Sequence, residues 1–201
     1  MRWDNLFDDL EGQLEQELSA EEVDVRAEEE RLRLGRLSLR DRIVAVVEDE
    51  GRDAESSIRI ILTNGTPLTV RPQTFGRDWF SAGVLDGSTS KVQVIVPMAA
   101  IASVVFTRAQ AAASLTATPS ELSQTSLPAR LTLSFVLRDL CRRRSAVELS
   151  TVIGSLHGTI DRVGRDHIDL AVHEAGEARR ESAVRESRAI PLAQLLLVSV
   201  R

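Results

Sequence analysis

The chain contains much of its sequence twice, with the two copies about 94 residues apart. The string RLSL at residues 36–39 returns as RLTL at 130–133, and VPMAAIASVVF at 96–106 returns as IPLAQLLLVSV at 190–200. Self-similarity at a fixed spacing is typical of a duplicated structural unit. The repeat therefore constrains the architecture before any single residue is interpreted.

A third match lies between these two, where GRDWFSAGV at residues 76–84 returns as GRDHIDLAV at 164–172 with an offset of 88. The matches at the two ends of the repeat are 94 residues apart, and the match in the middle is 88 residues apart. The loops between the matching segments therefore differ in length between the two copies. The predicted organisation is an acidic helical arm at 1–35, a first repeat at 36–106, a linker at 107–129 and a second repeat at 130–201.

Charge is distributed unevenly between the arm and the rest of the chain. Residues 1–30 hold 12 acidic side chains against 2 basic ones, whereas the whole chain has a net charge of −5, so the remainder is mildly basic. An acidic segment joined to a basic body either competes with a polyanion for that body or keeps the protein in solution. Both interpretations stay open.

The sequence favours a cytoplasmic, bacterial protein without membrane contact. It contains one cysteine, Cys141, no apolar run long enough to cross a bilayer and no signal-peptide pattern. A single cysteine excludes an internal disulfide. All but one of the basic residues are arginine, a bias typical of high-GC bacterial genomes.

The arm predicts an interaction surface. Its apolar residues recur every three or four positions, which places them on one stripe of a helix that needs a partner surface. The partner is another helix in a coiled coil or the chain's own body. The residues of this stripe are Trp3, Leu6, Phe7, Leu10, Leu14 and Leu18. A second helix is predicted from Ala20 to about Leu34, with i,i+4 ion pairs between Glu22 and Arg26 and between Glu29 and Arg33.

Each repeat is predicted to begin with a short helix and to continue as strands. Ser38 and Asp41 give a helix start signal for a helix ending near Val47, and Thr132 takes the capping role in the second repeat. Alternating apolar residues then surround an Asn64-Gly65 turn, which indicates a hairpin. The predicted fold is mainly β, with two tandem five-stranded small barrels, closed or nearly closed, each preceded by a helix.

This pattern resembles the Sm-like (SH3-like) barrel, including the bacterial RNA chaperone Hfq. The resemblance rests on ILTNGTPLTV at 61–70, FGRDW at 75–79 and VPMAAIASVVF at 96–106, and it covers about 50 residues of each repeat. It implies RNA binding and strand edges that pair with a neighbouring barrel, as a homo-oligomer or as an intrachain pair. The whole chain also resembles a group of two-repeat proteins from high-GC bacteria.

The positions that bind RNA in the chaperone carry other residues here. The resemblance places them before the last strand of each repeat, at Pro97, Met98 and Ala99 and again at 191–193. None of these side chains donates a hydrogen bond or stacks an aromatic ring on a base.

We find no motif for catalysis or for a cofactor, and we predict a protein that is not an enzyme. The sequence has no phosphate-binding loop, dinucleotide fingerprint, GxSxG or HExxH motif. His167, Asp169 and His173 alternate onto one face of a predicted strand, where the two histidines are about 20 Å apart at roughly 3.3 Å per residue. That separation is too large for a shared metal ion, so no metal site is predicted. Cys141 is interpreted as a packed thiol.

Arginines of the second repeat form the candidate nucleic-acid surface. They are diluted by interleaved acids, so a self-paired charged surface is the competing interpretation. The candidate residues are Arg142, Arg143, Arg144, Arg162, Arg165, Arg179 and Arg180, accompanied by Arg185 and Arg188. Two functional hypotheses follow: a nucleic-acid-binding regulator, or a protein-interaction adaptor that binds no nucleic acid.

Overall fold

The computed structural model describes residues 22–49, 57–85, 92–117, 127–176 and 180–200. The apolar stripe predicted in the arm between Trp3 and Leu18 lies outside these ranges, as does Arg179. Within them, helices precede and connect the strands of one ten-stranded antiparallel sheet.

The sheet repeats one strand order twice. Its order is β5-β1-β2-β3-β4 followed by β10-β6-β7-β8-β9, so the second half places its strands as the first half does. Bulges interrupt β2 after Pro72 and β7 after Ile160, at corresponding places in the two repeats, and they bend the sheet. The strands are β1 (Ile58–Leu62), β2 (Pro67–Phe75), β3 (Trp79–Val84), β4 (Gln93–Pro97), β5 (Ile101–Val105), β6 (Ala146–Thr151), β7 (Gly154–Val163), β8 (His167–Val172), β9 (Glu186–Pro191) and β10 (Leu195–Val200).

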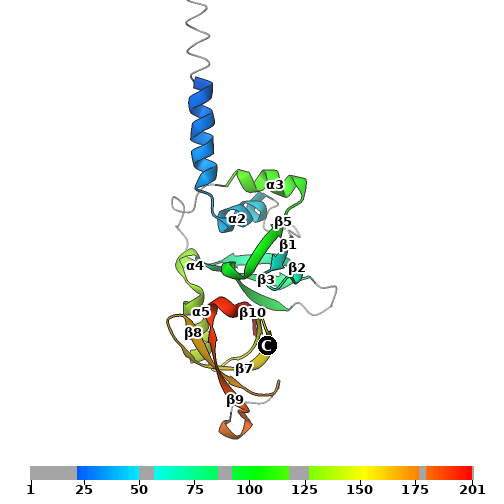
Figure 1. Cartoon of the computed structure of the whole chain (residues 1–201), viewed down its shortest axis with the longest axis vertical. Coiled ribbons are helices and arrows are strands. Elements are labelled where there is room, and N and C mark those ends of the chain that lie inside the picture. Colours follow the sequence, from blue (N-terminus) through cyan, green and yellow to red (C-terminus); the bar gives the residue numbers. More distant parts are fainter. Residues whose placement is uncertain (1–21, 50–56, 86–91, 118–126, 177–179, 201) are drawn as a thin grey trace, which may run out of the picture.

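We expected each repeat to close into a small barrel, and this expectation is wrong. The last strand of the first half, β4, pairs with β10 of the second half, with Ile95 opposite Val198 and Val94 opposite Ser199. A strand edge needs backbone partners, and the second repeat offers such an edge within the same chain. One open sheet therefore runs through both repeats and ends at β5 and β9 (Figure 1).

Two separate cores lie along this sheet. In the first, α2 (Leu39–Asp49) contributes Ile43 and Val46 against the strands of the first half. In the second, α5 (Leu133–Arg142) contributes Leu133 and Leu137 against the strands of the second half. Each repeat thus begins with a helix, as the sequence predicts, and that helix packs on the core of its own repeat.

The linker region holds two further helices, α3 (Arg108–Leu115) and α4 (Leu127–Arg130). A capping box between Thr107 and Gln110 begins α3, which packs beside α2. Among the described residues there are also three 3₁₀ turns, η1 (Met98–Ala100), η3 (Glu181–Ala183) and η4 (Leu192–Gln194). Within the described ranges, no helix combines the length and apolar character that crossing a membrane requires.

The two repeat helices begin in different ways. Ser38 and Asp41 cap α2 reciprocally: the Asp41 carboxylate accepts from Ser38 N–H at 3.0 Å, and Asp41 N–H donates to Ser38 Oγ at 3.1 Å. This start signal is confirmed. In α5 the predicted cap is wrong, because the Thr132 side chain makes no capping hydrogen bond. Asp78, from the loop before β3 of the other repeat, instead accepts from Leu133 N–H at 2.7 Å.

The cap across the repeats leads to a prediction. Replacing Asp78 by alanine leaves a helix N–H without its acceptor, and we expect the free energy of unfolding to fall by about 0.5–2 kcal/mol. Asp166 occupies the corresponding position of the second repeat and is exposed, so Asp166→Ala is the matched control, with an expected change within about 0.5 kcal/mol. Urea unfolding of both variants measures the difference. Equal losses in the two variants would contradict the assigned cap.

Candidate functional surfaces

The N-terminal helix is an exposed surface with apolar side chains. Its described part is helical over residues 22–35 and continues away from the body (Figure 1), in agreement with the predicted second helix. Val25 and Leu32, seven residues apart, are 52% and 54% exposed, and Val23 is 61% exposed. The predicted ion pair between Glu22 and Arg26 is present at 3.6 Å. The helix therefore displays apolar residues among charges without contacts that bury them.

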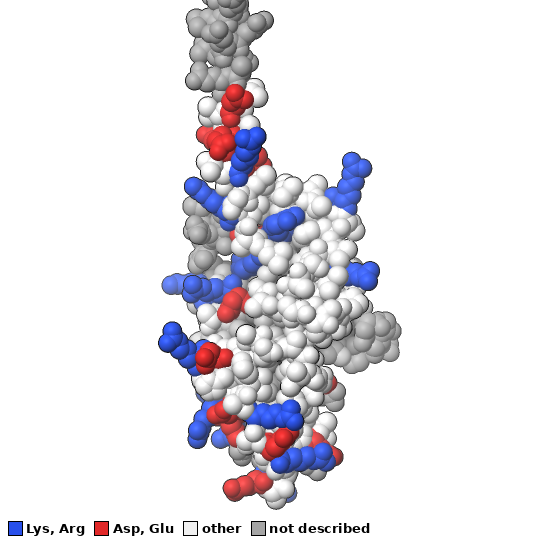
Figure 2. Space-filling view, in the orientation of Figure 1, with Lys and Arg blue, Asp and Glu red and all other residues white. Residues whose placement is uncertain are grey.

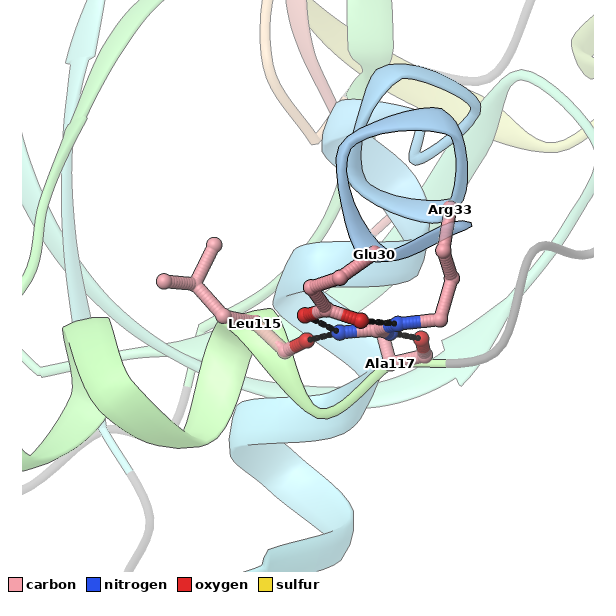
Figure 3. Close-up of polar contacts among 4 residues, drawn as sticks. All are labelled: Glu30, Arg33, Leu115 and Ala117. Atoms are coloured by element: carbon pink, nitrogen blue, oxygen red, sulfur yellow. Dashed lines mark hydrogen bonds and ion pairs between the residues drawn. The ribbon is translucent and has the colours of Figure 1, made fainter. Parts of the chain in front are cut away.

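Arg33 attaches this helix to the body (Figure 3). Its guanidinium donates to the carbonyl oxygens of Leu115 and Ala117, at 2.6 and 2.7 Å, where α3 ends. Glu30, one turn earlier, accepts from the same guanidinium through both carboxylate oxygens at 2.7 Å. The sequence had predicted Glu29 as the partner of Arg33; the structure places Glu30 there. We call Glu30, Arg33 and the two carbonyls the Arg33 clamp.

Hydrogen bonding within the clamp also shifts its titration. The bond from Arg33 lowers the pKa of Glu30, and partial desolvation opposes this shift. The same bond raises the pKa of Arg33. Because the pKa of Glu30 is depressed in the folded state, its contribution is present above the ordinary carboxyl pKa. It is lost as the pH falls through the lowered value.

Three of the seven candidate nucleic-acid arginines are paired with acids. Arg142 and Arg143 both contact Asp139, and Arg143 Nε lies 2.6 Å from that carboxylate. Arg144 contacts Asp161 at 3.1 Å. The i,i+3 and i,i+4 spacing from Asp139 is visible in the sequence and is the signal that predicts these pairs. The pair with Asp161 joins the turn after α5 to β7, and local spacing does not predict it.

The remaining arginines of this surface divide into two groups. Arg185 pairs with Glu174, and Arg188 pairs with Glu186. Among the described residues, Arg162, Arg165 and Arg180 form no ion pair. Figure 2 shows basic and acidic side chains interleaved over the second repeat on the visible face. The charge pattern is thus mixed on this face, with a few cations unneutralised.

The histidines of the second repeat do not assemble into a metal site in the described structure. His173 is buried, 3% exposed, with Nε2 at 2.9 Å from Thr159 Oγ1 and Nδ1 at 3.0 Å from the carbonyl of Glu174. The His157 and His173 rings lie edge to face at 5.4 Å. The thiol of Cys141 donates to the Asp161 carbonyl at 3.3 Å. These polar groups serve packing of β7, β8 and α5.

His167 pairs with its neighbour Asp166 at the surface. Their side chains are 2.9 Å apart, and this hydrogen bond raises the pKa of His167 and lowers that of Asp166. A raised histidine pKa stabilises the fold below the ordinary value, and this contribution is lost as the pH rises through the raised value.

This pairing gives a measurable prediction. In the Asp166→Asn variant the acceptor charge is gone, so we expect the His167 pKa to fall back toward its ordinary value. An NMR titration of the His167 imidazole resonances in the unaltered and Asp166→Asn proteins measures it. A His167 pKa unchanged by the substitution would contradict the assigned hydrogen bond.

No family model, curated protein or solved structure matches this chain.

Proposed function

We propose that this protein is a non-enzymatic adaptor whose exposed N-terminal helix recruits another protein to a body of two Sm-like units. The observation that carries the proposal is the Arg33 clamp, which fixes an exposed helix with apolar side chains to the body at a defined position. A helix that serves only solubility has no need of such an attachment. The proposed cytoplasmic location is compatible with this role.

Strand order supports Sm-like units in the body. Each half contains a helix followed by five antiparallel strands, in which the fifth strand lies beside the first and the others follow in sequence. The two units are opened into one sheet by the pairing of β4 with β10. The turn between the fourth and fifth strands is η1 in one unit and η4 in the other.

Charge supports the adaptor over nucleic-acid binding. Two carboxylates, Asp139 and Asp161, pair with Arg142, Arg143 and Arg144, which are the densest part of the candidate surface, and offset most of their charge. A cation that contacts a phosphate gains affinity by releasing counterions from the nucleic acid. An arginine already paired with a carboxylate contributes less to this affinity. The residues of η1 and η4 likewise offer no aromatic ring for stacking on bases.

A photo-cross-linking amino acid at position 25 or 32 tests the adaptor in the full chain. We expect covalent adducts with a different protein, in higher yield than from the same group at position 153. Ile153 is the matched control because it is apolar and 87% exposed but lies on the turn between β6 and β7. Adducts equally abundant at all three positions, or none at 25 and 32, would contradict the proposal.

The clamp itself gives a further prediction. Arg33→Ala is expected to accelerate hydrogen exchange of the amides at 28–35, with β6 to β8 unchanged, because the helix loses its contacts to Leu115 and Ala117. Lowering the pH through the depressed pKa of Glu30 is expected to act in the same direction. Arg31→Ala is the matched control, since the pair that Arg31 forms is with Glu28, one turn away on the same helix. Equal exchange in both variants would contradict the clamp.

Nucleic-acid binding stays a second candidate because Arg162 and Arg165, on and just after β7, form no ion pair among the described residues. If these side chains contact phosphates, the Arg162→Ala, Arg165→Ala double variant weakens RNA binding and lowers its salt slope by about two. Filter binding at low salt measures both quantities. Absence of affinity for RNA and DNA under those conditions would remove this candidate.

A further inference from the structure

Four apolar side chains cross the junction between the repeats. From the first repeat, Trp79 belongs to the second core and Ile95 packs against it. From the second repeat, Leu196 belongs to the first core and Leu197 packs against it. The facing edges β4 and β10 therefore pair through their backbones, and each repeat also places apolar side chains in the core of the other.

The internal repeat identifies the residues that occupy the corresponding positions at the two free edges. At the β9 end, Trp79 corresponds to His167 and Ile95 to Ala189. At the β5 end, Leu196 corresponds to Ala102 and Leu197 to Ser103. Each of the four is smaller or more polar than its counterpart, and all four are exposed.

The backbone around these positions is the same at the junction and at the free end. Gly76 N–H donates to the Trp79 carbonyl at 2.8 Å, and Gly164 N–H donates to the His167 carbonyl at 2.8 Å. In both loops the aromatic ring lies against the glycine, where an added Cβ would collide with it. The difference between the two ends thus lies in the side chains and leaves the loop conformation unchanged.

The N-termini of α2 and α5 also differ in whether they need a residue from a neighbouring unit. The N-terminus of α5 relies on Asp78 from the other repeat, whereas Ser38 and Asp41 satisfy α2 from within its own repeat. The α2 end therefore needs no carboxylate from a neighbouring unit. On the outer strand β9, Arg188 stands where β4 has the buried Val94, and it pairs with Glu186. Charged side chains on an edge strand discourage pairing with another sheet.

We propose that the side chains of β5 and β9 prevent these outer edges from pairing with another strand. Units therefore pair edge to edge within one chain, and a second copy of the chain does not add to either end of the sheet. Head-to-tail contacts, in which one edge of a unit binds the opposite edge of the next unit, otherwise continue into rings or filaments. Here the two inner faces carry the apolar residues that make the contact, and the two outer faces carry smaller or polar residues at the corresponding positions. This inference is independent of the proposed adaptor role, because it concerns the sheet edges and the adaptor uses the N-terminal helix.

Rebuilding the edges in the full chain tests the proposal. One variant carries Ala102→Leu and Ser103→Leu on the β5 edge, and another carries His167→Trp and Ala189→Ile on the β9 edge. Sedimentation velocity is run on each variant and on their mixture. We expect each variant alone to keep the mass of the unaltered protein. We expect the mixture to form a species of twice that mass, in an amount that increases with concentration.

A blocked variant is the matched control. Ala102→Asp with Ala189→Asp places a carboxylate on each outer edge, and we expect it to keep the mass of the unaltered protein. A lower mass in the blocked variant would overturn the proposal, because the unaltered edges would then be in use. The proposal is also overturned if both rebuilt variants keep the circular dichroism of the unaltered protein and their mixture does not associate. If either rebuilt variant fails to fold, the comparison of mass between the blocked and unaltered proteins still tests the proposal. Association through the N-terminal helix affects all samples equally and is thereby distinguished.

Discussion

Replacing Trp79 by alanine is expected to lower the free energy of unfolding by about 3–5 kcal/mol. Trp79 is 7% exposed and belongs to the core of the second repeat although it begins β3 of the first. Its indole N–H also donates to the Leu131 carbonyl at 3.0 Å, just before α5. The substitution therefore removes a large apolar side chain from the second core and a part-buried hydrogen bond beside it.

Hydrogen exchange distinguishes this account from a local effect in the first repeat. We expect the largest loss of protection in α5 and in the strands around it, and a smaller one in β1 and β2. His167→Ala is the matched control, because His167 holds the corresponding place at the outer end and is exposed. Its expected change is within about 0.5 kcal/mol. Loss of protection confined to the first repeat in the Trp79 variant would contradict the shared packing.

Leu196→Ala is expected to have the reciprocal effect, with a loss of about 2–5 kcal/mol. Leu196 is 1% exposed and lies on β10, yet it belongs to the core of the first repeat. Leu195→Ala is the matched control, because the adjacent Leu195 is equally buried but belongs to the second core. Both variants are expected to lose stability, measured by urea unfolding. Hydrogen exchange is expected to increase first in β1 to β3 for Leu196→Ala and in β6 to β8 for Leu195→Ala. The same exchange pattern in both variants would contradict the assignment of these leucines to different cores.

Local features of the fold were predictable from the sequence. The Asn64-Gly65 turn joins β1 and β2, with Gly65 at a φ of 85°, and the Ser38–Asp41 signal begins α2. These features depend on residues close together in the chain, whose turn and capping preferences are strong. Duplication extended the predictions to the second repeat. There Gly154, at the turn between β6 and β7, has a positive φ of 137°.

Long-range pairing was not predictable in the same way. Apolar alternation in β4 and β10 indicates strands, but it does not say whether each closes on its own repeat or pairs with the other. The cap from Asp78 to Leu133 spans 55 residues, so local sequence does not predict it. The pairing of Arg144 was not predictable for a related reason, since Asp161 lies on β7 and reaches Arg144 only through tertiary packing.

The central claim is that β4 pairs with β10, so that both repeats share one sheet. Cross-strand nuclear Overhauser effects between backbone protons in the uniformly labelled full chain test it most directly. We expect backbone contacts between β4 and β10 at two places, where Ile95 faces Val198 and where Val94 faces Ser199. Contacts between β4 and β5 of the same repeat, such as Ile95 with Val104, in place of those to β10 would show closed separate barrels and would contradict it.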